Sequence, residues 1–134
     1  MDASKVAMIR ECIQDSFAGR TSFPQEVRRL AADGIERYEA DLVRLCKTFY
    51  TASGEAQVEP LPLTDSGRVA DRFAVDDLKA ALLAVQRREI DYPEFLRRAI
   101  AAGSASYVVF LNRWRTIYLG RHGDFHLEDL PKPA

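Results

Sequence analysis

The chain has few of the residues that most often carry chemistry or hold metals. Its 134 residues include two cysteines, two histidines and one tryptophan. Cys12 and Cys46 are too few for a framework of disulfides, and no metal-binding spacing surrounds them. We therefore expect two reduced, buried thiols in a cytoplasmic protein, and no metal or other cofactor.

The sequence also lacks a marked excess of charge and a long apolar run. Its formal net charge is −1, and acidic residues stand among the arginines, so nothing attracts it to nucleic acid or an anionic membrane. No apolar run reaches the roughly 18 residues of a membrane-spanning helix, and residues 1–12 are too charged for a signal peptide. We expect neither nucleic acid nor a membrane as a partner.

What the chain does contain is an internal duplication. When the sequence is shifted by 69 positions without a gap, many residues fall on identical ones; examples are Gly34 and Gly103, Tyr38 and Tyr107, Gly54 and Gly123, and Glu59 and Glu128. Repetition at a fixed period indicates repeated structural units. The prediction is a single domain of residues 1–134, with repeats at 2–62 and 71–131 and a linker at 63–70.

Each repeat has the pattern of two helices followed by three strands. In the first repeat we expect helices over 4–17 and 22–33 and strands over 35–42, 46–51 and 56–60. In the second we expect helices over 76–88 and 91–103 and strands over 107–111, 114–119 and 125–129. Ser22 and Asp91 each precede a proline in the first helical turn, with Gln25 or Glu94 three residues on, which predicts two capping boxes.

Side-chain directions follow from the same patterns. On the helix after Ser22 we expect Val27, Leu30 and Ala31 to face inward. We also expect Val58 to face inward and Trp114 to share a strand face with Tyr118.

The elements together predict an α+β fold with antiparallel strands and one core shared about a pseudo-two-fold axis. Gly34 and Gly103 should end helices with positive φ. The strand from Tyr107 to Leu111 should be the most buried, and the Tyr107 hydroxyl should find a hydrogen-bond partner.

The second repeat carries a further pattern. It runs Tyr-Pro-Glu-Phe from Tyr92, Ala-Gly-x-x-x-Tyr-Val from Ala102, and Tyr-x-Gly-x-x-Gly from Tyr118, with Glu128 and Pro131 beyond. In these residues the chain resembles a family of small bacterial proteins of about this length, of unknown function and loosely labelled phage-envelope-protein-like. The resemblance extends over nearly the whole chain and implies the fold, but no activity or site.

The sharpest candidates for catalysis lie near the C-terminus. His126 and Glu128 are two apart on a strand and share one face, and Asp124 is in line with them. The three could form an acid–base pair or hold a divalent ion. The alternative is a polar edge strand in solvent; the first repeat has Gln57 at the position of His126.

A second candidate rests on the repeats. Glu59 and Glu128, with Tyr38 and Tyr107, would be related by the axis, and two carboxylates meeting there would raise each other's pKa. The alternative is that each glutamate pairs with an arginine of its own repeat, such as Arg44 or Arg113.

Three classes of function follow. The first is a small soluble binding or interaction module, which could form homo-oligomers. It is suggested by the aromatic residues, which exceed what a small core needs. The second is a small-molecule-binding protein with a pocket between the repeats, and the third is a small enzyme using His126 with Glu128 or Asp124. A deep pocket with converging polar groups would favour the second or third class. The candidate ligand-binding residues are Trp114, Tyr118, Tyr107, Tyr38 and Glu59.

Overall fold

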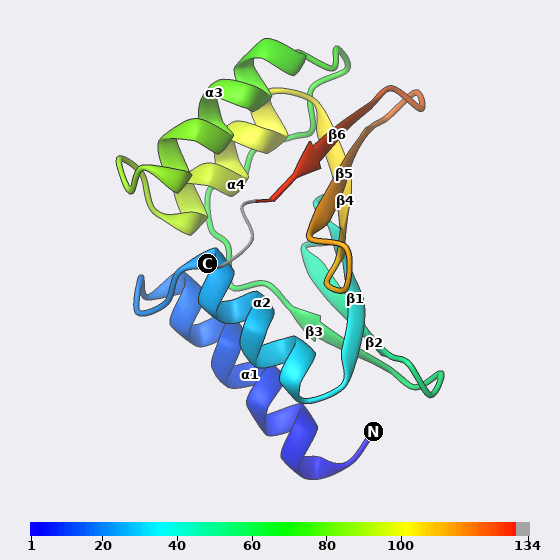
Figure 1. Ribbon diagram of the computed structural model, residues 1–134. Helices are drawn as coiled ribbons and strands as arrows, with labels where there is room; N and C mark the ends of the chain where they lie inside the picture. Colours follow the sequence, from blue (N-terminus) through cyan, green and yellow to red (C-terminus); the bar gives the residue numbers. More distant parts are fainter. Residues whose placement is uncertain (131–134) are drawn as a thin grey trace.

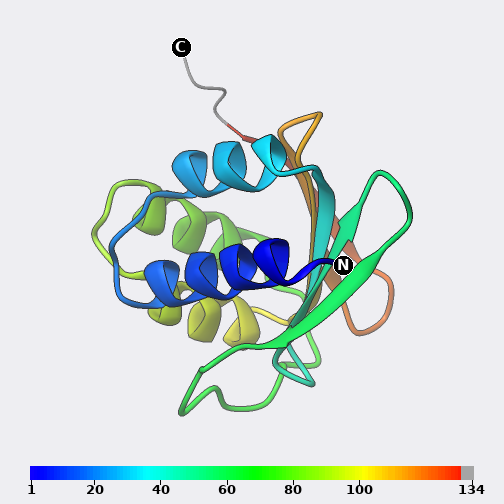
Figure 2. The same cartoon turned by 90° about the horizontal axis from the view of Figure 1, so that it is seen from below.

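One six-stranded antiparallel sheet carries all four helices on one of its faces (Figures 1 and 2). The computed structural model describes residues 1–130, so residue 131, the expected end of the second repeat, lies outside it. The first repeat contributes α1 (Ala3–Phe17), α2 (Phe23–Ala32), β1 (Ile35–Asp41), β2 (Cys46–Thr51) and β3 (Ala56–Pro60). The second contributes α3 (Val75–Gln86), α4 (Tyr92–Ala101), β4 (Ser104–Phe110), β5 (Arg115–Gly120) and β6 (Phe125–Asp129). The predicted α+β duplication is confirmed.

Three helices, α1, α2 and α4, begin with a side-chain cap, whereas α3 has none. Asp2 accepts a hydrogen bond from the Lys5 amide at 2.8 Å, and Ser22 and Gln25 form a complete capping box at the start of α2. Asp91 caps α4 by accepting from the Glu94 amide at 2.9 Å. Such caps satisfy amides that the helix itself leaves free, and each stabilises by about 1 kcal/mol.

The two repeats join through their first strands. The sheet order is β3-β2-β1-β4-β5-β6, so β1 and β4 lie at the centre and β3 and β6 at the edges. Tyr38 pairs with Val109 and Ala40 with Tyr107, while the equivalent residues Glu39 and Val108 face each other. This register is unchanged when the repeats are exchanged, so the pseudo-two-fold axis passes between Glu39 and Val108.

A single core lies between the sheet and the helices. β1 and β4 direct Tyr38, Ala40, Tyr107 and Val109 into it, each at most 2% exposed, because alternate residues of a strand point to the same face. The segment between the repeats packs on α4: the Ala70 amide donates to the Ile100 carbonyl and the Ala74 amide to the Ala102 carbonyl. Within residues 1–130 no helix is long and apolar enough to cross a membrane.

The conformational predictions for two glycines and for Tyr107 are confirmed. Gly34 and Gly103 follow α2 and α4 with φ of 86° and 92°. The Tyr107 hydroxyl forms a hydrogen bond with the hydroxyl of Tyr92.

Three predicted side-chain directions are wrong. Val58 is 58% exposed, because Glu59 takes the inward position of β3 to reach Arg10 of α1. Ala31 is exposed, and Glu26 is buried with Val27 and Leu30. Trp114 precedes β5 in a turn with φ 52° and does not continue the strand face of Tyr118.

Candidate functional site

A pocket of about 420 Å³ lies between the helices of the two repeats, above the sheet. The N-termini of α2 and α4 flank it, since Ser22 and its equivalent Asp91 both line it, as do the next pair, Phe23 and Tyr92. The volume falls within the roughly 300–1,000 Å³ typical of small-molecule sites. The duplication therefore builds the pocket, with equivalent residues on opposite walls.

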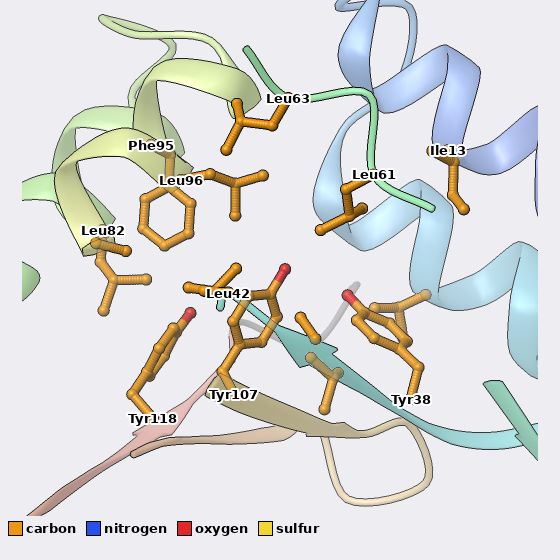
Figure 3. Packing of buried hydrophobic residues seen from close by; sticks show 14 of the residues in the cluster. Ile13, Tyr38, Leu42, Leu61, Leu63, Leu82, Phe95, Leu96, Tyr107 and Tyr118 are labelled. Atoms are coloured by element: carbon orange, nitrogen blue, oxygen red, sulfur yellow. The ribbon is translucent and has the colours of Figure 1, made fainter. Parts of the chain in front are cut away.

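The floor and walls of the pocket are largely aromatic. Tyr107 of β4 and Tyr118 of β5 rise from the sheet toward Phe95 of α4 and Leu82 of α3 (Figure 3). The Phe95 and Tyr118 rings meet edge to face with centroids 6.4 Å apart, and those of Tyr107 and Tyr118 are 5.2 Å apart. Both tyrosines point toward the helices because alternate residues of a strand lie on the same face of the sheet.

Glu26 of α2 is the exception in this apolar lining. The residue is only 5% exposed. Its Oε2 accepts a hydrogen bond from the Ser16 hydroxyl of α1 at 2.8 Å, whereas its Oε1 is buried and has no hydrogen-bond partner among residues 1–130. An unpaired buried polar atom costs roughly 1–3 kcal/mol. A residue of the pocket lining therefore holds a desolvated acceptor without a partner.

Lys47 of β2 places a positive charge in the same layer. The residue is 1% exposed, and its Nζ lies 4.8 Å from the Tyr38 ring centroid and 4.7 Å from that of Tyr92. Desolvated cation–π contacts of this kind stabilise by about 2 kcal/mol. No carboxylate of the described residues lies within 4.0 Å of its ammonium, so Lys47 forms no salt bridge among them.

The surroundings of the tyrosines keep them neutral. Burial raises the pKa of Tyr38, Tyr92, Tyr107 and Tyr118 well above the ordinary value of 10.0. The negative charge of Glu26 further raises the pKa of the first three, while Lys47 opposes the rise in the pKa of Tyr107. The hydroxyls thus act as hydrogen-bonding groups and not as phenolates at neutral pH.

Of the predicted catalytic trio, two residues come together. His126 Nε2 lies 2.7 Å from Glu128 Oε2 on the inner face of β6, with side chains 14% and 28% exposed. Asp124 lies outside the strand, in the preceding turn, and is exposed. The equivalent residues of β3 form the same contact, with Gln57 Nε2 donating to Glu59 Oε2 at 2.7 Å. The same contact forms at both edges of the sheet, with glutamine at one and histidine at the other. A structural role for the pair therefore explains it without catalysis.

Glu59 and Glu128 do not meet at the axis. The strand order places β3 and β6 at opposite edges, so the hypothesis of a shared carboxylate pair is wrong. Glu59 pairs with Arg10 at 2.7 Å, which holds its pKa below the usual range against the effect of burial. Arg44, the partner suggested from the sequence, pairs instead with Asp41.

The proposed ligand-binding residues divide in the same way. Tyr107 and Tyr118 line the pocket. Tyr38 lies in the core beside Lys47, and Trp114 packs on the edge of the core, where its carbonyl accepts from the Leu130 amide.

The other histidine lies in a shallow, open depression at the second repeat. His122 Nε2 is 2.7 Å from Asp71 Oδ1, with side chains 60% and 78% exposed. Within residues 1–130, no group of three His, Cys, Asp or Glu side chains is arranged to hold a metal ion.

No protein-family model matches the chain, and no curated protein matches it. The resemblance to the small bacterial family stays a prediction.

Sequence reasoning missed Glu26, Ser16 and Lys47. The duplication held a signal for Glu26 and Ser16. The shift of 69 places Glu26 on Phe95 and Ser16 on Val85, both apolar, whereas Lys47 falls on the polar Thr116. A charged residue at a position whose equivalent is apolar marks a polar group directed into the core.

Proposed function

We propose that this protein binds a small organic molecule in the pocket between its two repeats. The observation that carries the proposal is an aromatic cavity of about 420 Å³ with a buried carboxylate oxygen that no described residue satisfies. Apolar pockets with a few converging polar groups are the usual form of small-molecule sites. The cost of leaving Glu26 Oε1 unpaired is recovered when a ligand donates to it.

A neutral apolar dye tests whether the pocket takes a ligand. Nile red fluorescence should increase on addition of the protein, and Val85→Phe, which places a larger side chain at the pocket wall, should weaken binding. Val58→Phe is the matched control, because Val58 is on β3, away from the pocket, and 58% exposed. Equal binding by the two variants would contradict the proposal.

Self-association is a second candidate, supported by the bare face of the sheet. In the second repeat this face carries the apolar residues Val108, Ile117, Leu119, Phe125 and Leu127, of which Phe125 is 68% exposed. The equivalent positions of the first repeat include the polar Glu39 and Thr48. An apolar face that is continuous in the second repeat suits an interface with a second copy, which buries the same patch on both subunits.

Light scattering after gel filtration tests this candidate. A dimeric mass should appear as concentration rises, and Leu127→Lys should return the mass to that of a monomer. Gln14→Lys is a control at an exposed position of α1, on the opposite side of the sheet. A monomer at every concentration would contradict self-association.

As part of the proposal we place the protein in the cytoplasm, where Cys12 and Cys46, both free, would stay reduced.

A further inference from the structure

We infer that the ligand is an organic amine, whose protonated nitrogen binds Glu26 while its apolar body lies among the aromatic side chains. This inference rests on the proposed function and adds the chemical class of the ligand. It begins with Glu26 Oε1, a buried acceptor that lacks a donor among the described residues. A carboxylate accepts hydrogen bonds and donates none, so the ligand must supply a donor.

The Ser16 contact fixes which oxygen is free. The Ser16 hydroxyl donates to Oε2 at 2.8 Å and belongs to α1, whereas Glu26 belongs to α2. Both residues line the pocket. The serine therefore holds the carboxylate in one orientation before a ligand arrives, which reduces the entropy lost on binding.

The charges around the pocket favour a cation. Of the lining residues, Glu26, Glu89 and Asp91 are acidic and Arg88 is basic. Charge-assisted hydrogen bonds between an ammonium group and a carboxylate are about twice as strong as neutral ones. Aromatic faces also attract organic cations, and Lys47 already shows this attraction inside the same layer, against Tyr38 and Tyr92.

Lys47 also sets the main competing hypothesis, since a buried ammonium would attract an anionic ligand. It does not line the pocket, and its Nζ is directed at the rings of Tyr38 and Tyr92. The Tyr92 ring contacts the Lys47 ammonium and also lines the cavity. Glu26, unlike Lys47, lines the pocket.

Three indole compounds that differ only in their end group test the inference by calorimetry. Tryptamine carries an amine, tryptophol a hydroxyl and indole-3-acetate a carboxylate. We expect tryptamine to bind about tenfold or more tighter than tryptophol, and indole-3-acetate to bind least, because the pairing of opposite charges at a desolvated site is worth more than a neutral hydrogen bond. Tryptophol or indole-3-acetate binding as tightly as tryptamine would overturn the amine inference.

Two variants assign the effect to Glu26. Glu26→Gln should reduce the preference for tryptamine over tryptophol to about twofold or less, since the amide removes the charge but keeps the shape. Glu128→Gln, a half-buried carboxylate on β6 outside the pocket lining, should leave the preference unchanged. A preference that survives Glu26→Gln would also overturn the inference.

The Nile red measurement separates the two levels of failure. If Nile red binds and is blocked by Val85→Phe while the three indoles bind alike, the pocket stands and the amine inference is wrong. If neither the dye nor any indole binds in the pocket, the proposed function itself is wrong.

Discussion

Glu26 and Phe95 occupy equivalent positions in the two repeats, and both line the same pocket. The Glu26 carboxylate accepts a hydrogen bond from the Ser16 hydroxyl, whereas the Phe95 ring packs edge to face on Tyr118. Ser16 has diverged in step, because its equivalent in the second repeat is the apolar Val85. The polar pair on one wall and the apolar pair on the other make the pocket asymmetric, although the backbone around it repeats.

The first prediction concerns the stability cost of that polar pair. Replacing both members, Ser16→Ala with Glu26→Leu, should raise the free energy of unfolding by about 1 kcal/mol, because it removes a buried oxygen without a partner and leaves no new orphan. Urea denaturation measures the change. Glu26→Leu alone should gain less, since it strands the Ser16 hydroxyl. A large loss in the double variant would show instead that Glu26 is needed to balance the charge of Lys47.

The second prediction compares two glycines with nearly the same backbone conformation. Gly34→Ala should cost about 1 kcal/mol, the strain of a side chain at positive φ, since its Cβ would meet only Lys5 Nζ at 3.8 Å. Gly103→Ala should cost about 2–4 kcal/mol, because its Cβ would also collide with the Arg72 carbonyl and force a well-packed segment apart. Thermal denaturation of the two variants gives the comparison. Equal losses would mean that the backbone at Arg72 moves freely away from α4.

The third prediction concerns the thiols. Burial, assisted by the negative charge of Glu26, raises the pKa of Cys12 from 9.0 to about 11, and the thiolate is the reactive form. Cys46 is partly exposed. Iodoacetamide at pH 8 should therefore modify Cys46 in the native protein and Cys12 only after unfolding, as mass spectrometry of digests would show. Cys46→Ser provides the control, and rapid labelling of that variant would contradict the burial of Cys12.

The fourth prediction is a loss of stability in alkali. The pKa of Tyr38, Tyr92, Tyr107 and Tyr118 is raised in the folded protein. As pH rises through 10.0, their ordinary pKa, the unfolded chain releases these protons and the native chain keeps them. The native state then binds more protons, so the free energy of unfolding falls with rising pH.

Urea denaturation at a series of pH values from neutral to alkaline measures that fall. Below the ordinary pKa, these tyrosines should cause no change of the free energy of unfolding with pH. Above it, the free energy of unfolding should decline. Tyr118→Phe should make the decline shallower, because a phenylalanine has no proton to lose. A stability that stays constant through this range would show that the hydroxyls are not held in an apolar layer.

Much of the fold could be predicted from the sequence because the two repeats carry the same local signals. Caps at Ser22 and Asp91 and glycines at the two helix ends indicated the same elements in both repeats, and local signals of this kind act over a few residues. The errors came where a distant partner decides direction: Arg10 draws Glu59 inward on β3, so Val58 faces out.

The sequence by itself determined the duplication, the order of helices and strands, and the hydrogen-bonded burial of Tyr107. Only the tertiary structure decided that β1 pairs with β4, which sends Glu59 and Glu128 to opposite edges, and that Glu26 enters the pocket with one oxygen unpaired. The physical reason is that periodicity fixes which face of an element is buried, whereas the contacts made there depend on how four helices and two halves of a sheet share one core.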